Sequence, residues 1–398
     1  MSDRLLSRGY VAWLAATTLS ATGDGVLFFA LAWTATGLGA QVAALVVTAG
    51  LLPGVLFTLV GGAMADRWGL RRTIIGCDLA MCVLLAGYLA ISGLDLPDAL
   101  LLAGLALGEG IVDAFHRPAD GAFPRLFFDD EALPRGMSLT GTVLSVSRLA
   151  GPPLGGIVVV ALALRGAALA DLVSFALILV VLVAVRPPYE PSPEGGQTSS
   201  TLSRILEGLR AARAVPGTAA LLGAVALVAG SLLPMLSLCV PLISRSRGWG
   251  AGTSGLVEAA WITGTLVVGV LVARTGTRAD PTGPLVGGPI LAAIGALGVA
   301  VAPAPAAALA GAGVMGVGTA VFTSHVFPLF VLRTPEGMLA RFQALMTVVQ
   351  LLPVLIGENV VGAVSSRFGP SWAVVAVAAA CASAGVLARS PTAVGRAR

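Results

Sequence analysis

Ionisable residues inside long apolar stretches are the part of this sequence whose types and positions suit chemistry. A charged side chain at mid-depth of a hydrocarbon layer costs roughly 3 kcal/mol or more, so each one needs a reason to be there. A carboxyl group placed there can bind a proton and release it when its access to water changes. The candidates for proton coupling or substrate contact are Asp24, Glu109, Arg148, Glu258 and Glu358.

Asp24 is the first of these candidates along the chain, and Gly23 and Gly25 flank it. It lies about fourteen residues into the first apolar stretch, roughly 21 Å along a helix that rises 1.5 Å per residue. We expect Asp24 to bind and release a proton. The alternative is a structural hydrogen bond between helices.

Glu109 and Arg148 both fall near the middle of their apolar stretches. An ion pair is the expected arrangement, and if that pair opens, Glu109 becomes a proton or cation site. Glu258 and Glu358 are candidates for contact with a polar or cationic substrate, and structural pairing is the alternative for each.

Three further polar residues stand in apolar stretches: Asp171, His325 and Gln350. Gln350 shares a helical region with Glu358. A histidine can titrate near neutral pH, so a proton role is the alternative for His325. We expect Asp171 and His325 to be structural.

The apolar stretches identify an all-α integral membrane protein, because 57% of the residues are hydrophobic and only 11% are charged. One crossing of a hydrocarbon core about 30 Å thick needs roughly 20 helical residues, and the chain offers about twelve such stretches. They lie near 10–36, 42–64, 73–92, 98–116, 138–163, 168–185, 217–243, 252–273, 284–302, 305–331, 343–364 and 371–388.

The arginines set the predicted orientation, because all 24 basic residues are arginine and cytoplasmic loops carry an excess of them. With both termini placed inside, only Arg165, Arg245, Arg247 and Arg367 fall at the outer boundaries, and all others except Arg148 fall at the inner ones. The sequence therefore predicts cytoplasmic termini and a multi-pass protein of the inner (plasma) membrane.

Metal, cofactor and enzyme chemistry are not predicted. The cysteines, Cys77, Cys82, Cys239 and Cys381, fall inside apolar stretches without the spacing of a metal site or disulfide framework. The glycine-rich residues 311–318 have no adjoining strand, which argues against nucleotide binding. We expect no cofactor, no metal and no nucleic-acid partner.

An internal repeat divides the chain into related halves. A shift of 207 residues aligns Gly62, Arg67, Gly69 and Arg71 with Gly269, Arg274, Gly276 and Arg278; a shift of 206 aligns Gly151 and Gly156 with Gly357 and Gly362. Residues 187–200 are rich in proline, glycine and serine, and 201–215 have an amphipathic helical pattern. The prediction is two six-helix bundles, 1–186 and 217–398, joined by a cytoplasmic linker at 187–216 with a short amphipathic helix.

Residues 61–72, GGAMADRWGLRR, resemble the loop between the second and third spans of the major facilitator superfamily. The residues that carry the likeness are Gly62, Asp66, Arg67, Gly69, Arg71 and Arg72. Leu70 departs from the pattern, since that position is often basic. The resemblance implies that this loop latches the outward-facing state, with Asp66 as its acid; a topology signal alone would explain the arginines but neither the glycines nor the acid.

A second likeness lies in the fifth stretch, where Gly151, Pro152, Gly155 and Gly156 have the spacing G-P-x-x-G-G. This resembles the antiporter motif of the superfamily, although serine replaces the upstream glycines at Ser138 and Ser147. Proline removes a backbone hydrogen bond and glycine permits close helix contact, so a kinked and tightly packed span is expected. The resemblance implies export, and the alternative is a merely structural kink.

Two further stretches are similar to the macrolide-efflux and siderophore-exporter branch of that superfamily. Their matching residues are Phe115, His116, Pro118, Ala119, Pro124 and Leu133 in one stretch, and Ser20, Gly23, Asp24 and Ala30 in the other. The resemblance implies a monomeric, proton-coupled exporter of small hydrophobic or amphipathic molecules that works by alternating access. An importer of a small nutrient and a non-transporting membrane sensor or structural protein are the alternatives.

Overall fold

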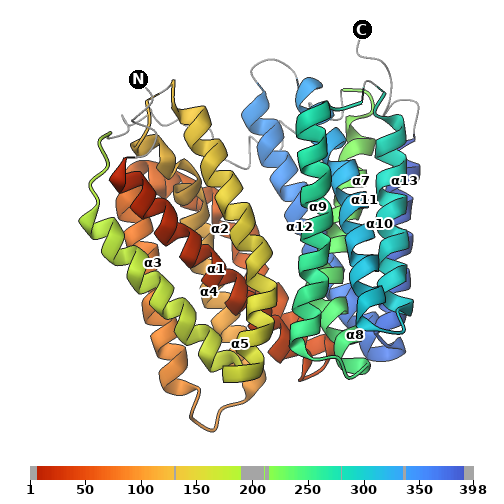
Figure 1. The fold of residues 1–398 in the computed structure, drawn as a ribbon, viewed down its shortest axis with the longest axis horizontal. Coiled ribbons are helices and arrows are strands. Elements are labelled where there is room, and N and C mark those ends of the chain that lie inside the picture. The colour runs from red at the N-terminus through yellow and green to blue at the C-terminus, as the bar shows by residue number, and fades with distance from the viewer. Residues whose placement is uncertain are drawn as a thin grey trace. The chain divides into compact units, whose positions relative to one another are not determined.

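A computed structural model shows a protein that consists mainly of long helices (Figure 1). The structure describes residues 7–129, 131–189, 210, 215–278, 280–334 and 338–389, and these contain no strand. Water is absent from a hydrocarbon core, so a spanning segment must bond its own N–H and C=O groups, which a helix does. The all-helical membrane fold predicted from composition is confirmed.

The helices follow one another with short connections except between Ala184 and Thr218, a segment that lies mostly outside the described residues. In the first half they are α1 (Arg8–Thr36), α2 (Ala40–Trp68), α3 (Leu70–Ile91), α4 (Asp98–Ala122), the 3-10 turn η1 (Phe123–Leu126) and α5 (Leu133–Ala184). In the second half they are α7 (Thr218–Pro234), the π-helical turn η2 (Met235–Cys239), α8 (Val240–Ser246), α9 (Ala251–Thr275), α10 (Thr282–Val301), α11 (Pro305–Leu332), α12 (Leu339–Phe368) and α13 (Pro370–Ala388).

In the described residues, 11 helical segments are long and apolar enough to cross a membrane. One of them is α5, whose 52 residues would extend about 78 Å if straight, far more than one crossing needs. Ala163 interrupts this helix with φ 55° and ψ −168°, a conformation that favours glycine. The interruption falls at the end of the predicted span 138–163, so α5 contains that span and the next one, 168–185.

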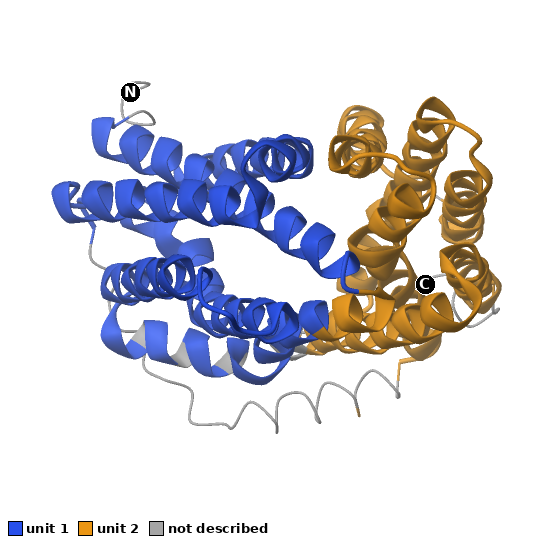
Figure 2. Ribbon diagram, turned by 90° about the horizontal axis from the view of Figure 1, so that it is seen from below, with its two compact units in different colours: residues 1–38, 46–197 blue, residues 39–45, 198–398 orange. Residues whose placement is uncertain are grey.

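The chain divides into two compact units (Figure 2). Unit 1 is Met1–Leu38 with Val46–Gln197, and unit 2 is Gly39–Leu45 with Thr198–Arg398. The predicted linker, 187–216, and its amphipathic helix lie almost wholly outside the described residues. The predicted bundle boundaries therefore remain a prediction.

Within unit 1, α1 packs mainly against α5, while α3 packs against α4 and α5. An aromatic cluster closes the end of this unit where α1 begins: Tyr10, Trp13, Phe123, Phe127 and Phe128, with ring centroids 4.6 to 5.8 Å apart. Tyr10 also donates from its hydroxyl to the carbonyl of Gly136 (3.1 Å). Trp13 is therefore packed within this cluster.

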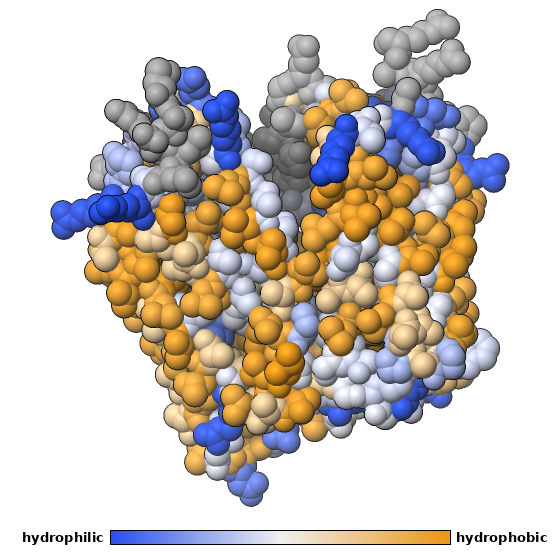
Figure 3. Space-filling model, in the orientation of Figure 1, coloured by the Kyte–Doolittle hydropathy of each residue, from blue (hydrophilic) through white to orange (hydrophobic). Residues whose placement is uncertain are grey.

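Within unit 2, α10 and α11 pack together, α9 covers α11, and α7 packs against α12 and α13. Large apolar side chains on the outer helix faces remain exposed in both units, such as Val160 at 72% and Val386 at 67%. On the face shown in Figure 3, hydrophobic side chains cover the middle of each unit and hydrophilic ones gather at its ends. This distribution suits a bilayer rather than water.

Candidate functional site

Asp24 lies where α1 crosses α5 most closely. A Cβ atom at residue 151 would lie 2.9 Å from the Cα of Gly25, so the two backbones touch and only glycine fits there. Gly155, one helical turn further, packs against Phe29 in the same way, at 3.0 Å. The close packing predicted for the G-P-x-x-G-G segment is present, and it acts directly on the segment of α1 that carries Asp24. Pro152 and Gly156 lie in the same stretch of α5, whose backbone stays helical through Pro152.

The other side of Asp24 faces the second part of α5. Gly23 packs so tightly against Asp171 that a Cβ atom at residue 23 would collide with the Oδ1 atom of that acid. Asp171 is fully buried and accepts a hydrogen bond from Ser174 (3.1 Å). The acid expected to be structural is therefore a close neighbour of the leading proton candidate.

The acids of this region act on one another electrostatically. Asp24 interacts with Asp171 and Asp113, which repel its negative charge, and with His116 and Arg117, which attract it. Glu109 interacts with Asp24 and Asp113. The side chain of Asp24 is itself exposed, and its charged neighbours come from the other helices of unit 1. A carboxyl group in such surroundings can bind and release a proton when its access to water changes.

Helix α4 contributes a stripe of ionisable side chains, Glu109, Asp113, His116 and Asp120, which we call the α4 stripe. Their spacing of four, three and four residues places them on one face of the helix. The Oε1 atom of Glu109 and the Oδ1 atom of Asp120 are buried and have no hydrogen-bond partner among the described residues. The stripe extends from mid-helix to the end of α4 near Ala122.

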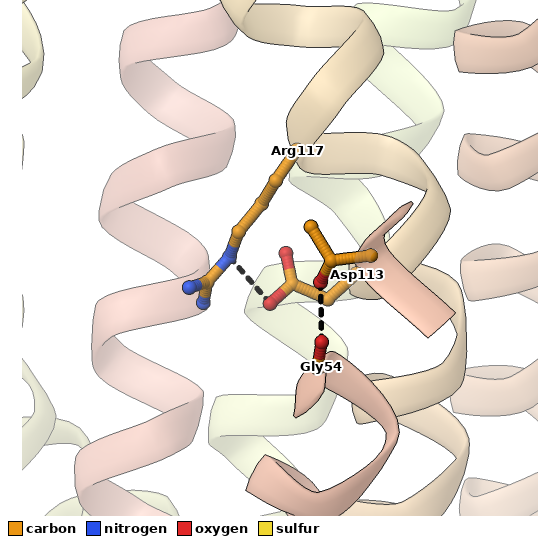
Figure 4. A network of polar contacts seen from close by, with 4 residues as sticks. Gly54, Asp113 and Arg117 are labelled. Atoms are coloured by element: carbon orange, nitrogen blue, oxygen red, sulfur yellow. Dashed lines mark hydrogen bonds and ion pairs between the residues drawn. The ribbon is translucent and has the colours of Figure 1, made fainter. Parts of the chain in front are cut away.

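The α4 stripe is partly paired. Arg117 reaches back along α4 and places its Nε atom 2.5 Å from the Oδ2 atom of Asp113 (Figure 4). The same view includes Gly54 of α2, whose carbonyl accepts a hydrogen bond from Thr58 (2.5 Å). His116 lies 3.1 Å from Asp78 of α3, measured from Nε2 to Oδ1. Both pairs join an acid to a base inside unit 1.

The predicted ion pair between Glu109 and Arg148 stays a prediction, because the side chain of Arg148 lies outside the described residues. Glu109 is partly buried in α4. The structure thus brings Asp24, Glu109 and the glycines of α5 into one region of unit 1. It adds Asp171, Asp113 and the pair of His116 with Asp78.

In unit 2, Glu358 of α12 is the most enclosed acid, with 1% of its surface exposed. Its Oε1 atom accepts a hydrogen bond of 2.5 Å from Ser237, and its Oε2 atom has no hydrogen-bond partner in the described part of the chain. Ser237 belongs to the π-helical turn η2, and such turns occur often at functional sites. Glu358 therefore keeps one free oxygen for a polar group or a proton.

Glu258, the other acid candidate of unit 2, is partly buried in α9. No described residue forms a hydrogen bond or an ion pair with it. Gln350 donates to the carbonyl of Met346 in its own helix (3.3 Å). Neither residue is drawn into a network with Glu358.

Two backbone groups contact the ring nitrogens of His325. The backbone N–H of Arg278 donates to its Nε2 atom (3.2 Å), so that nitrogen carries no proton. Its Nδ1 atom lies 2.9 Å from the carbonyl of Val321, to which it donates. Both ring nitrogens are therefore satisfied, which supports the structural role expected for His325.

The loop with the superfamily signature joins α2 to α3. Gly69 has φ 90°, a conformation that glycine adopts without strain, and its N–H bonds the carbonyl of Ala65 (2.9 Å) to end α2. Arg71 donates to the carbonyl of Leu182 from Nε and Nη2 (3.1 and 2.6 Å) and so caps the end of α5. Gly62 lies in α2, and Arg67 and Arg72 are exposed. The side chain of Asp66 lies outside the described residues.

The sequence interpretation missed Asp78, Asp113 and Asp120, and it treated His116 only as part of a family likeness. The spacing of the α4 stripe was a readable signal, since four ionisable residues on one helical face are unusual in a membrane span. Asp78 stands within the apolar stretch TIIGCDLAMCVLL, which was the signal for that residue.

Comparisons with known proteins agree with this fold. The sequence model described as Major Facilitator Superfamily matches residues 13–358. The chain is 24% identical over 272 residues to the multidrug efflux pump Tap of Mycolicibacterium fortuitum, covering 66% of this chain and 65% of that pump. It is 28% identical over 216 residues to the Tap pump of Mycobacterium tuberculosis (strain ATCC 25618 / H37Rv), covering 50% and 49%. The match thus spans less than two thirds of the length of these relatives.

Solved structures of similar fold include a bacterial homologue of the iron transporter ferroportin, with a TM-score of 0.70 and 18% identity over 96% of this chain and 98% of that one. The nucleoside transporter NupG superposes with a TM-score of 0.75 and 10% identity, covering 95% and 98%. At these identities the likeness shows the fold alone. The relatives and structural neighbours are transporters, not enzymes.

Proposed function

The chain belongs to the Major Facilitator Superfamily, and from this premise we propose that it exports small hydrophobic or amphipathic molecules in exchange for protons. Transport follows alternating access, in which the substrate site opens to one side of the membrane and then to the other. The multidrug efflux pumps among its relatives support the outward direction and the class of substrate.

The observation that carries the proposal is the position of Asp24. It lies between a glycine packed on Asp171 and a glycine packed on Gly151, so both parts of α5 touch α1 beside it. A small rotation between α1 and α5 would change the surroundings of this carboxyl group. Proton binding at Asp24 and the arrangement of these helices would then be linked.

The other candidates have secondary roles in this mechanism. Glu109 accepts or passes a proton near Asp24, and Arg148 pairs with it in one stage of the cycle. Glu358 and Glu258 contact polar groups of the substrate in unit 2. The loop from Gly62 to Arg72 holds one of the two end states, with Asp66 as its acid.

The test is substrate-driven proton movement in proteoliposomes that contain the purified protein, measured with a panel of hydrophobic antibiotics and siderophores. In Asp24→Asn we expect proton movement to fall about 100-fold or more, the size of effect when a proton-transferring group is removed. The control is Asp98→Asn, which removes an exposed acid from the first turn of α4 and should transport as the wild type does.

The outcomes separate the alternatives. A signal that survives in Asp24→Asn would move the coupling to Glu109, Glu258 or Glu358. Substrate-driven proton movement with inward substrate flux would make the protein an importer. Silence of the folded wild type across the panel would favour a sensor or structural role.

A further inference from the structure

Asp78 is a fully buried acid that has no role in the export mechanism proposed above. Its Oδ1 atom forms an ion pair with Nε2 of His116 at 3.1 Å, and neither atom forms a hydrogen bond in the part of the chain described. Its Oδ2 atom has no hydrogen-bond partner there at all. A positive charge beside such a carboxylate stabilises it, and a protonated His116 supplies one.

His116 lies between the buried carboxylate of Asp78 and the surface of the protein. The side chain of His116 is 20% exposed, whereas that of Asp78 is 0% exposed. Besides Asp78, the acids Asp120 and Asp24 act on the ring. Arg117 follows His116 directly, but it is paired with Asp113. The imidazole can therefore exchange a proton at Nδ1 while Asp78 holds the ring in place at Nε2.

The α4 stripe places proton carriers on both sides of His116 along the helix. Successive members are three or four residues apart, about 4.5 to 6 Å along the axis, a gap that one water molecule or one side-chain rotation can bridge. Glu109 and Asp113 lead from His116 towards Asp24, and Asp120 leads to the end of α4 that the arginine distribution predicts to be cytoplasmic. This spacing suits stepwise transfer of a proton along the helix rather than binding of a proton at one position.

We propose that His116, positioned by Asp78, passes protons along the α4 stripe between the region of Asp24 and the cytoplasmic end of α4. The proposal deepens the proposed proton-coupled export and rests on it. His116 is the residue that transfers the proton. Asp78 is a positioning residue that stabilises the charged ring.

One proton moves in each step. A proton from the region of Asp24 and Glu109 binds the Nδ1 atom of His116, which forms no hydrogen bond with the described residues, and the ring becomes an imidazolium whose Nε2–H faces Asp78. The Nδ1–H bond then breaks, and the proton passes to Asp120 or to water.

The first measurement is made without substrate. Its signals can be assigned because the chain has only 2 histidines. Nitrogen NMR of histidine-labelled protein in lipid would show one signal set for each, and His325→Gln would assign them. We expect His116 to change its protonation state between about pH 5 and about pH 8, and this transition to shift in Asp78→Asn.

The second measurement is transport in proteoliposomes by His116→Gln and Asp78→Asn. We expect substrate-driven proton movement to fall about tenfold or more, while exchange of labelled for unlabelled substrate, which needs no net proton transfer, stays at the wild-type rate. His325→Gln and Asp98→Asn serve as controls. The thermal unfolding midpoint of each variant shows whether it is folded.

Each outcome decides the proposal. If the wild type couples protons to substrate and both variants do so at the wild-type rate, the relay is wrong and the proposed function stands. If His116 keeps one protonation state across the pH range, its pair with Asp78 is a fixed structural contact and the relay is also wrong. If the wild type moves no protons, proton-coupled export fails first, and the relay fails with it.

Discussion

Units 1 and 2 share a helix contact but differ in the chemistry beside it. In unit 1, Gly25 of α1 meets Gly151 of α5; in unit 2, Gly230 of α7 meets Gly357 of α12, where a Cβ atom at residue 357 would collide with the carbonyl oxygen of residue 230. The 206-residue shift of the predicted internal repeat relates Gly151 to Gly357. A close crossing occurs in both units, because small residues let two helices approach each other closely.

The acidic residue beside this contact lies on α1 in unit 1 but on α12, the counterpart of α5 in this contact, in unit 2. Asp24 adjoins Gly25 on α1, whereas Glu358 adjoins Gly357 on α12. The helices of unit 1 also carry acids at Asp78, Asp98, Glu109, Asp113, Asp120 and Asp171, whereas the described helices of unit 2 have Glu258 and Glu358 alone. Fewer acids lie in the described helices of unit 2, and proton exchange belongs to unit 1 in the mechanism we propose.

The largest effect is expected from filling the duplicated contact. In Gly357→Ala the new methyl group would meet the Gly230 carbonyl and lie 2.9 Å from Cγ of Pro234, so unfolding free energy should fall by about 2 to 3 kcal/mol. Gly151→Ala, which meets a Cα atom at 2.9 Å, should cost about 1 to 2 kcal/mol. Thermal unfolding in detergent measures both.

The matched controls are Gly269→Ala in unit 2 and Gly104→Ala in unit 1. No atom lies within 4 Å of the methyl group that either substitution adds. Alanine favours a helix over glycine by up to about 1 kcal/mol, so these variants should be neutral or slightly stabilised. If Gly357→Ala unfolds at the same temperature as its control, α7 and α12 do not approach each other as closely as described.

A smaller effect is expected at Glu358, and it separates the roles of the two units. Glu358→Gln keeps an oxygen for the bond from Ser237, and Ser237→Ala removes that bond. Each should lower apparent substrate affinity up to about tenfold, the worth of one hydrogen bond, with the number of protons per substrate unchanged. Substrate dependence of transport and proton counting in the same vesicles measure the two quantities. Loss of proton movement in Glu358→Gln would show that proton exchange is not confined to unit 1.

The smallest effect is expected at Arg165, one of two arginines that bond helix ends on the predicted outer side. Arg247 donates to the last carbonyls of α10, at Val299 (3.1 Å), Ala302 (2.6 Å) and Ala300, and stacks over Trp249. Arg165 makes one long bond, 3.5 Å, to Leu89 near the end of α3. Arg247→Ala should therefore lower the unfolding free energy by about 1 to 2 kcal/mol and Arg165→Ala by about 0.5 kcal/mol or less. Equal losses in thermal unfolding would contradict this ranking.

The candidate site could be predicted in part. Asp24, Glu109 and Glu358 were identifiable because an acid inside an apolar stretch is costly wherever the chain folds. The role of Asp171 was not, because nothing within the segment 168–185 indicates that its acid meets Gly23. Ser237 was equally hidden, since the π-helical turn that presents it to Glu358 depends on how α7 packs against α12.

The sequence by itself determined that this chain forms membrane-spanning helices, where each begins and ends to within a few residues, and which superfamily it belongs to. Hydropathy and glycine, proline and arginine spacing are properties of one segment at a time, so they can be read locally. Only the tertiary structure decided which helix faces meet: Asp78 with His116, Gly25 with Gly151, and His325 with the backbone of residue 278. Those contacts depend on the rotation and crossing of whole helices, which small residues permit but the spacing within one helix does not fix.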